Sequence, residues 1–90
     1  MKVTKTAQAG AQESNDILIT VLPNEQGGVQ VQLEAKGVIL KQFGKQMEQV
    51  IRDKVEEMGV EDITIKAQDK GALDYTIRAR VQAALERAFA

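Results

Sequence analysis

The spacing of apolar residues changes along this chain, and that change limits the folds it can adopt. Residues 16–22 and 29–34 are β-rich runs, and the second alternates strictly between apolar and polar side chains. Residues 38–58 and 72–89 instead repeat apolar side chains at helical spacing. A third β-rich run, residues 60–67, lies between the two helical stretches. The order β-β-α-β-α predicts a small α+β two-layer sandwich, in which a sheet of three or four strands carries two helices on one face.

Turn residues separate these runs. Pro23 has no backbone N–H to offer a neighbouring strand and ends the first run. Gly27 and Gly28 are free to adopt positive φ, which predicts a turn that joins the first two strands as a hairpin. Gly59 is placed to end the first helix in a left-handed conformation. Residues 69–71 are interpreted as another turn, because they are too short for a phosphate-binding loop.

Length and polarity indicate how the chain is organised. Ninety residues with 43% hydrophobic content provide for one compact domain with a single core. Residues 1–12 are small and polar and have no clear period, so we expect residues 1–15 to form a flexible arm and residues 16–90 to form the domain. Polar residues follow Met1-Lys2, and no run approaches the roughly 20 apolar residues of a membrane span. We therefore expect a soluble, cytoplasmic protein with no membrane partner.

Charge and aromatic content argue against a nucleic-acid partner. Lys and Arg number 12 and Asp and Glu number 13, so the net charge of -1 gives no strong field to attract phosphate backbones. The aromatic residues Phe43, Tyr75 and Phe89 are scattered and form no recognisable platform for stacking bases.

The chain contains no histidine and no cysteine, which restricts its own chemistry. Without imidazole or thiol it lacks the usual nucleophile and base pair, and no spacing of its acids implies a pocket of converging carboxylates. We expect no catalytic residues and no metal site.

Ser14, in Gln12-Glu13-Ser14-Asn15-Asp16 ahead of the first strand, is then either an ordinary turn serine or an attachment point. Arg78 and Arg80 lie two apart in the second helix and so face different ways, which indicates solvated or partner-facing cations instead of one phosphate clamp.

Three stretches, residues 13–16, 41–44 and 69–80, together resemble the acyl carrier protein of citrate lyase, its gamma subunit. The resemblance implies that Ser14 carries a phosphoribosyl-dephospho-coenzyme A group through a phosphodiester, attached by a prosthetic-group transferase. It also implies that the thiol of this group holds acetyl and citryl thioesters while the alpha and beta subunits cleave citrate to acetate and oxaloacetate. The chain would then be a non-catalytic carrier within a lyase complex. One departure is Asn15, where the family often has Gly or Ser.

Two other functions are compatible with these residues. The carrier subunit of malonate decarboxylase uses the same type of prosthetic group, so a related complex is one alternative. A small non-catalytic interaction module, binding through an open sheet face or through Arg78 and Arg80, is another. An ordinary acyl carrier is disfavoured, because such proteins present Asp-Ser-Leu at the start of a helix in an acidic helical bundle, whereas Ser14 precedes a β-rich run.

Overall fold

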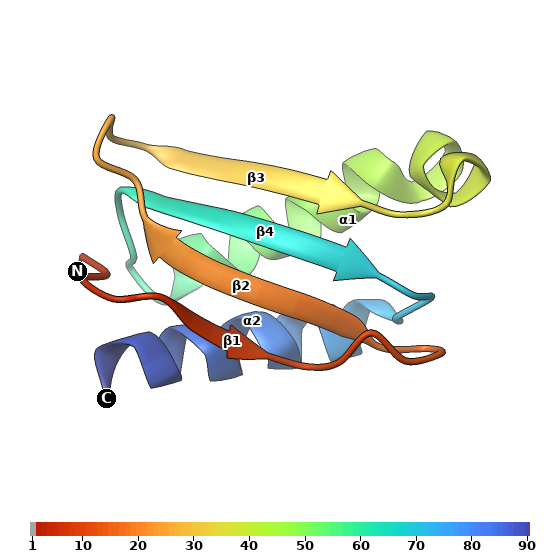
Figure 1. Cartoon of the computed structure of the whole chain (residues 1–90). Coiled ribbons are helices and arrows are strands. Elements are labelled where there is room, and N and C mark those ends of the chain that lie inside the picture. The colour runs from red at the N-terminus through yellow and green to blue at the C-terminus, as the bar shows by residue number, and fades with distance from the viewer. Residues whose placement is uncertain (1) are drawn as a thin grey trace.

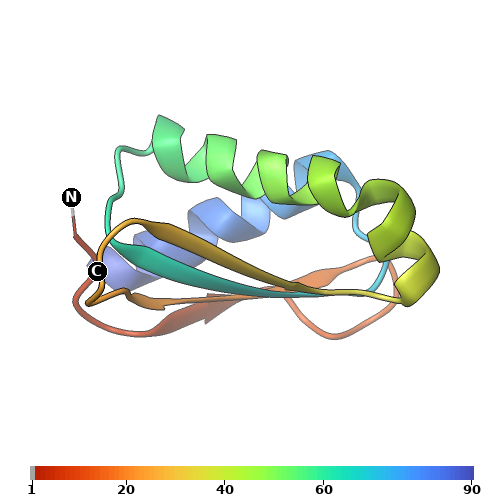
Figure 2. The same cartoon turned by 90° about the horizontal axis from the view of Figure 1, so that it is seen from above.

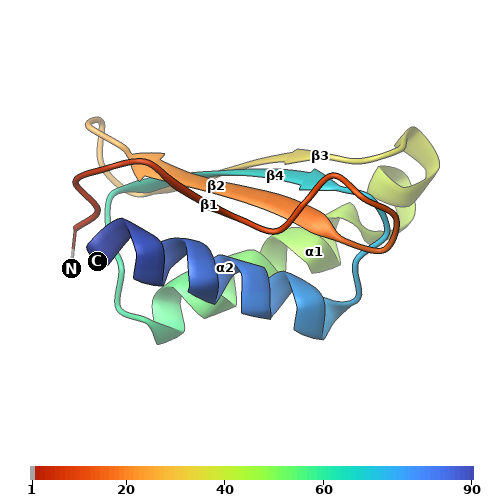
Figure 3. The same ribbon diagram turned by 60° about the horizontal axis from the view of Figure 1, so that its bottom comes forward.

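The computed structural model describes residues 2–90, so Met1, the first residue of the expected arm, lies outside the described chain. The elements, in chain order, are β1 (Ala7–Ala9), β2 (Ile17–Pro23), β3 (Val29–Glu34), α1 (Gly37–Glu57), β4 (Ile63–Asp69) and α2 (Asp74–Phe89). The strands form one sheet in the order β1-β2-β4-β3, with β4 antiparallel to β2 and parallel to β3 (Figure 1). Both helices cover the same face of this sheet (Figures 2 and 3). The predicted α+β two-layer sandwich is confirmed.

The core lies between the sheet and the two helices. Alternation puts every second residue of β2 and β4 on the helix side, and the helical stripes of α1 and α2 meet them. The large side chains that are almost completely buried there are Ile17, Ile19, Val21, Ile51, Val55, Ile63, Ile65, Ile77, Val81 and Leu85. Burying each such side chain contributes about 1.5–3 kcal/mol, which supports helices that would be marginal alone. No helix in residues 2–90 is long and apolar enough to cross a membrane.

The predicted hairpin of the first two β-rich runs is wrong, because β4 lies between β2 and β3. The turn with Gly27 and Gly28 folds over the start of β4 instead of closing a hairpin. Its contacts are the N–H of Gly28 to the Asp62 carboxylate at 2.8 Å and the N–H of Ile63 to the Gly28 carbonyl at 3.0 Å. The central place of β4 follows from burial, since it is the strand with the most buried side chains, whereas β3 is a half-exposed edge strand.

The expected boundary between a separate arm and the domain after residue 15 also needs correction. Ala7–Ala9 form an edge strand that pairs antiparallel with β2, and the side chains of Val3 and Ala9 belong to the core. Pairing with β2 and packing on α2 order this segment, although its own sequence has little preference for a strand. Residues 2–15 therefore belong to the same structural unit as the rest of the chain.

The apolar stripes of the helices are only partly buried. Met47, Ile51 and Val55 of α1 are buried as the spacing predicts, but Leu40 and Phe43 are exposed. The first turns of α1 extend beyond the ends of the strands, where no sheet covers them (Figure 1). The exposed apolar side chains therefore gather at the end of the molecule where β3 and β4 run into their helices.

Candidate attachment site

Ser14 lies in a tight turn immediately before β2. The N–H of Asp16 donates to the carbonyl of Glu13 at 3.1 Å, which closes a four-residue turn with Ser14 and Asn15 in the middle. Asn15 has φ +66°, a left-handed conformation that asparagine adopts more readily than most residues. Ser14 is exposed, and its hydroxyl makes no hydrogen bond to any of residues 2–90. The turn therefore presents a free hydroxyl to solvent.

The turn is held firmly against the end of β4. The N–H of Asn15 donates to the carbonyl of Lys70 at 2.8 Å, and the N–H of Lys70 donates to the carbonyl of Asp16 at 2.9 Å. These bonds extend the β2–β4 ladder, in which Ile17 pairs with Asp69. Ser14 is thus presented by an anchored turn, which differs from the expected flexible arm.

An ion pair between Asp16 and Arg80 ties the same turn to α2. Arg80 Nε donates to Asp16 Oδ1 at 3.0 Å, Arg80 Nη2 donates to Oδ2 at 3.3 Å, and the N–H of Ile17 donates to Oδ1 at 2.7 Å. The hydrogen bonds from Arg80, followed by that from Ile17, hold the pKa of Asp16 below its usual range. Arg78 is exposed and has no ion pair within the described residues, as expected for a solvated cation. The same expectation is wrong for Arg80, because Arg80 is half-buried and paired with Asp16.

Gly10 lies at the start of the loop that carries Ser14 and packs closely against Ile17 and Arg80. Its φ is +91°, and a Cβ atom built on it would lie only 1.9 Å from the carbonyl oxygen of Ile17 and 3.1 Å from Cδ of Arg80. No side chain fits in this space. Gly10 therefore lets the chain pass between β2 and the Arg80 side chain on its way to the serine turn.

Replacing Asp16 with Asn should reduce the stability of the fold in a pH-dependent way. Because its pKa is lower in the folded state, Asp16 contributes stability that is present above the unfolded value of about 3.9 and is lost as the pH falls through the folded value. At neutral pH we expect Asp16→Asn to lower the free energy of unfolding by about 1 kcal/mol, since the pair is partly solvated. Urea titrations at pH 7 and at successively lower pH below 4 should show this difference shrinking.

The arginines provide the controls for that experiment. Arg80→Gln removes the main partner of Asp16 and should lose most of this pH-dependent contribution, with the part due to the Ile17 N–H remaining, whereas Arg78→Gln should leave the stability curve unchanged. An equal loss in both arginine variants would contradict the role assigned to the Asp16–Arg80 pair.

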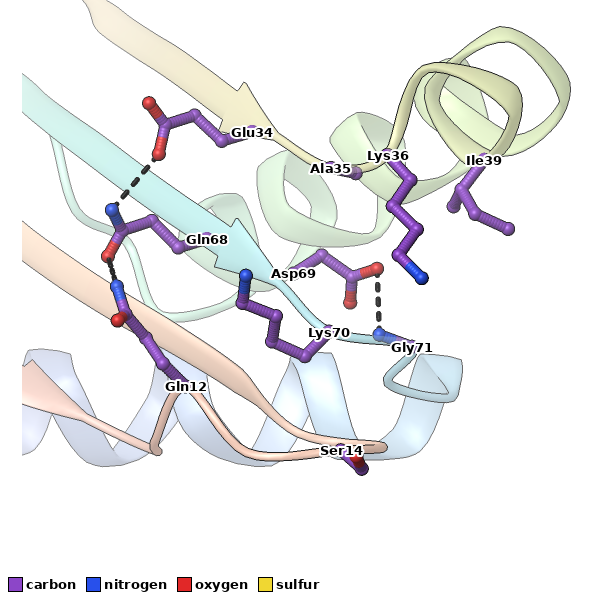
Figure 4. A pocket seen from close by; sticks show the side chains of 10 residues that line it. All are labelled: Gln12, Ser14, Glu34, Ala35, Lys36, Ile39, Gln68, Asp69, Lys70 and Gly71. Carbon is purple, nitrogen blue, oxygen red and sulfur yellow. Dashed lines mark hydrogen bonds between the residues drawn. The ribbon is translucent and has the colours of Figure 1, made fainter.

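A groove of about 750 Å³ opens beside the serine turn. It is bounded by Ser14, by the connection from β3 to α1 with Lys36, and by the connection from β4 to α2 with Lys70 (Figure 4). The two connections meet because the carboxyl ends of the parallel strands β3 and β4 lie at one edge of the sheet. Neither lysine ammonium group makes an ion pair or a hydrogen bond with any of residues 2–90.

The sequence indicated Ser14 but not the groove beside it. Residues 69–71 do form a turn, in which the N–H groups of Gly71 and Ala72 donate to the Asp69 carboxylate at 3.1 and 3.0 Å. Lys36 and Lys70 were missed because the predicted hairpin separated β3 from β4. The β-α-β order of these two strands, with a helix between them, was the signal for their parallel pairing. The described residues contain no group of three or more acidic side chains that could hold a metal ion.

Comparison with known proteins gives the family. The family described as "ACP: Malonate decarboxylase delta subunit (MdcD)" matches residues 4–88. The citrate lyase acyl carrier protein of Halothermothrix orenii is 49% identical over 88 residues, which are 98% of this chain and 90% of that protein. The chain belongs to this family of acyl carrier proteins. The citrate lyase acyl carrier protein of Streptococcus mutans is 46% identical over 67 residues, 74% of this chain and 64% of the relative.

The fold of this acyl carrier family also appears in a solved structure. A subunit in the crystal structure of a Pseudomonas malonate decarboxylase hetero-tetramer in complex with malonate superposes with a TM-score of 0.69. The match covers 96% of this chain and 86% of the other, at 18% sequence identity. At that identity the likeness concerns the fold alone.

Proposed function

We propose that this chain is the acyl carrier subunit of a citrate lyase and that Ser14 carries phosphoribosyl-dephospho-coenzyme A through a phosphodiester. The observation that carries the proposal is the exposed, unbonded hydroxyl of Ser14 on an anchored turn, in a chain whose relatives are named citrate lyase acyl carrier proteins. A covalent attachment needs a hydroxyl that a transferase can reach without unfolding the protein. Ser14 satisfies that need.

The residues around Ser14 fit such a group. Its hydroxyl would form the ester bond, and Lys36 and Lys70 line the groove beside it, where negative phosphate groups are favoured. When attached, the group supplies a thiol, which the chain itself lacks because it contains no cysteine. Because the turn is bonded to Lys70 and Arg80, the reach of the carrier would come from the attached group and not from the chain.

The role of the protein is to present the group, and catalysis belongs to partner subunits. The chain has no histidine or cysteine for acid-base or nucleophilic work. We propose that the alpha and beta subunits of citrate lyase act on the loaded carrier and that a prosthetic-group transferase loads it, in the cytoplasm. Because the group is tethered to the carrier, its thiol has a high effective concentration at each partner site. The carrier therefore needs no deep pocket of its own.

A carrier subunit of malonate decarboxylase is the second candidate. The description of the matching family and the fold of the Pseudomonas subunit favour it. The citrate assignment rests on the higher similarity, 49% identity over nearly the whole chain against 18% for the malonate decarboxylase neighbour. Reconstitution of the loaded carrier with citrate lyase subunits, and separately with malonate decarboxylase subunits, should give turnover only in the first case.

Intact-mass measurement tests the attachment. We expect the chain co-expressed with the transferase of a citrate lyase to gain the mass of one phosphoribosyl-dephospho-coenzyme A, and peptide mapping to place it on the segment that contains Ser14. A chain that gains no mass under conditions in which the Halothermothrix orenii relative is loaded would be an interaction module instead of a carrier.

A further inference from the structure

A second cavity adjoins the groove beside Ser14. It has a volume of about 520 Å³ and shares Ile39, Asp69 and Gly71 with the groove as lining residues. Its own walls include Phe43 of α1 and Tyr75 of α2. The two cavities are therefore neighbours, and together they make a depression that extends from the serine turn to the first turns of the two helices.

The two ends of this depression differ in chemistry. The end beside Ser14 carries the unpaired lysines Lys36 and Lys70, and Figure 4 shows Glu34 directed toward Gln68 and away from Lys36. The far end is apolar and exposed, with Phe43 46% and Tyr75 64% accessible. A cationic end followed by an aromatic end matches a ligand that has phosphates at one end and a flat ring further along.

The carboxylates in the depression accept hydrogen bonds from neutral groups, which orient them. Asp69 is buried and accepts the N–H groups of Gly71 and Ala72, and Asp74 accepts a hydrogen bond from Gln46 at 2.9 Å. The N-terminus of α1 at Lys36 has neither a capping side chain nor an acidic residue in its first turn, so its positive end adds to the charge of Lys36. These carboxylates keep their negative charge, so the attraction for a phosphate depends on the position of the unpaired ammonium groups of Lys36 and Lys70 and not on the net charge of the lining.

The exposed apolar side chains are concentrated at the same end. Large hydrophobic residues that are exposed in residues 2–90 are Val38, Leu40, Phe43, Leu73, Tyr75 and Phe89, and all but Phe89 lie on the first turns of α1 or at the start of α2. Clustered exposure of this kind marks a surface that is covered during function. The occupant that is always present in a loaded carrier is the group attached to Ser14.

We propose that this depression is a resting cradle for the nucleotide part of the group on Ser14, with its phosphates held by Lys36 and Lys70 and its ring against Phe43 and Tyr75. This inference rests on the proposed attachment at Ser14. It adds a role for Lys36, Lys70, Phe43 and Tyr75, which would bind a phosphorylated nucleotide. Stacking of a base on an aromatic side chain and salt-sensitive phosphate contacts are the interactions that it requires.

The unmodified chain can be tested with free dephospho-coenzyme A. Tyr75 is the single tyrosine and there is no tryptophan, so tyrosine fluorescence, corrected for absorption by adenine, reports this one position. We expect dephospho-coenzyme A to quench Tyr75, to bind more weakly as salt is raised, and to bind more tightly than adenosine, which lacks the phosphates. Lys36→Gln and Lys70→Gln should each weaken binding about threefold, the change expected for a partly solvated charge contact. Lys45→Gln, an exposed α1 position outside both cavities, is the matched control and should bind like wild type.

The outcomes separate this proposal from the attachment itself. If Ser14 gains the prosthetic group but Tyr75 responds neither to free dephospho-coenzyme A nor to loading, the cradle is refuted and the carrier role stands. If Tyr75 responds only to addition of the transferase or of lyase subunits, the apolar end is a protein-docking surface and the cradle is again refuted. If Lys45→Gln weakens binding as much as Lys70→Gln, the attraction is a general charge effect and the lysine assignments fail.

Discussion

Ser14→Ala is expected to abolish loading of the prosthetic group and all activity of the reconstituted complex, while the free energy of unfolding changes by no more than about 0.5 kcal/mol. The hydroxyl is exposed and makes no hydrogen bond within residues 2–90, so its removal leaves no unsatisfied partner in the fold. The turn depends on backbone bonds of Glu13, Asn15 and Asp16, which alanine does not alter. Intact mass after co-expression with the transferase, turnover with partner subunits, and urea titration measure the three quantities.

Other hydroxyls at this end of the chain supply the controls. Thr4 and Thr6 are exposed, and Thr20 on β2 accepts a hydrogen bond from Gln8 at 2.9 Å. Thr6→Ala should be loaded like wild type. Persistence of the added mass in Ser14→Ala would move the attachment to one of these threonines. Unfolding of Ser14→Ala would instead make the serine a structural residue of the turn.

The element order could be predicted because each element has its own period in the sequence. The strand order could be predicted only in part: the β-α-β order indicates the parallel pairing of β3 with β4, but nothing in the run at residues 60–67 marks it as the strand that also pairs with β2. Only the packed structure reveals that Ile63, Thr64 and Ile65 are all buried, which gives β4 the central place. The edge strand Ala7–Ala9 was missed for a related reason, because alanine and glutamine have weak strand preference and tertiary pairing with β2 decides the outcome.

The sequence singled out Ser14 as a candidate attachment point, but the contacts that hold its turn could not be predicted. Arg80 bonds to Asp16 across 64 residues of sequence, and nothing local to either residue marks the pairing. Asn15 stands where Gly or Ser was expected after the serine. Its φ of +66° is one that glycine adopts without strain, so Asn15 forms the same kind of turn that a glycine would form. The serine turn and residues 69–80 are far apart in the sequence but lie side by side in the fold, because β2 and β4 are neighbouring strands.

Gly10→Ala is expected to lower the free energy of unfolding by about 2–5 kcal/mol, the largest stability effect that we expect from a single methyl group in this chain. Two costs add together at this position. An L-residue at φ +91° is strained, and the new Cβ would lie 1.9 Å from the Ile17 carbonyl oxygen, so the backbone of β2 or of the serine loop must move. Urea titration followed by circular dichroism measures the loss.

Gly28→Ala separates the two costs of the Gly10 substitution. Gly28 has a nearly equal φ of +86°, but an added Cβ there meets no atom within 4 Å. Its substitution should therefore cost only the strain of the left-handed conformation, about 1–2 kcal/mol. Gly37→Ala, at the start of α1 with open space and no positive φ, should be neutral or slightly stabilising because alanine favours a helix. If Gly10→Ala cost no more than Gly28→Ala, the contact with Ile17 would not constrain the loop, and the anchoring of the Ser14 turn would depend on Lys70 and Arg80 alone.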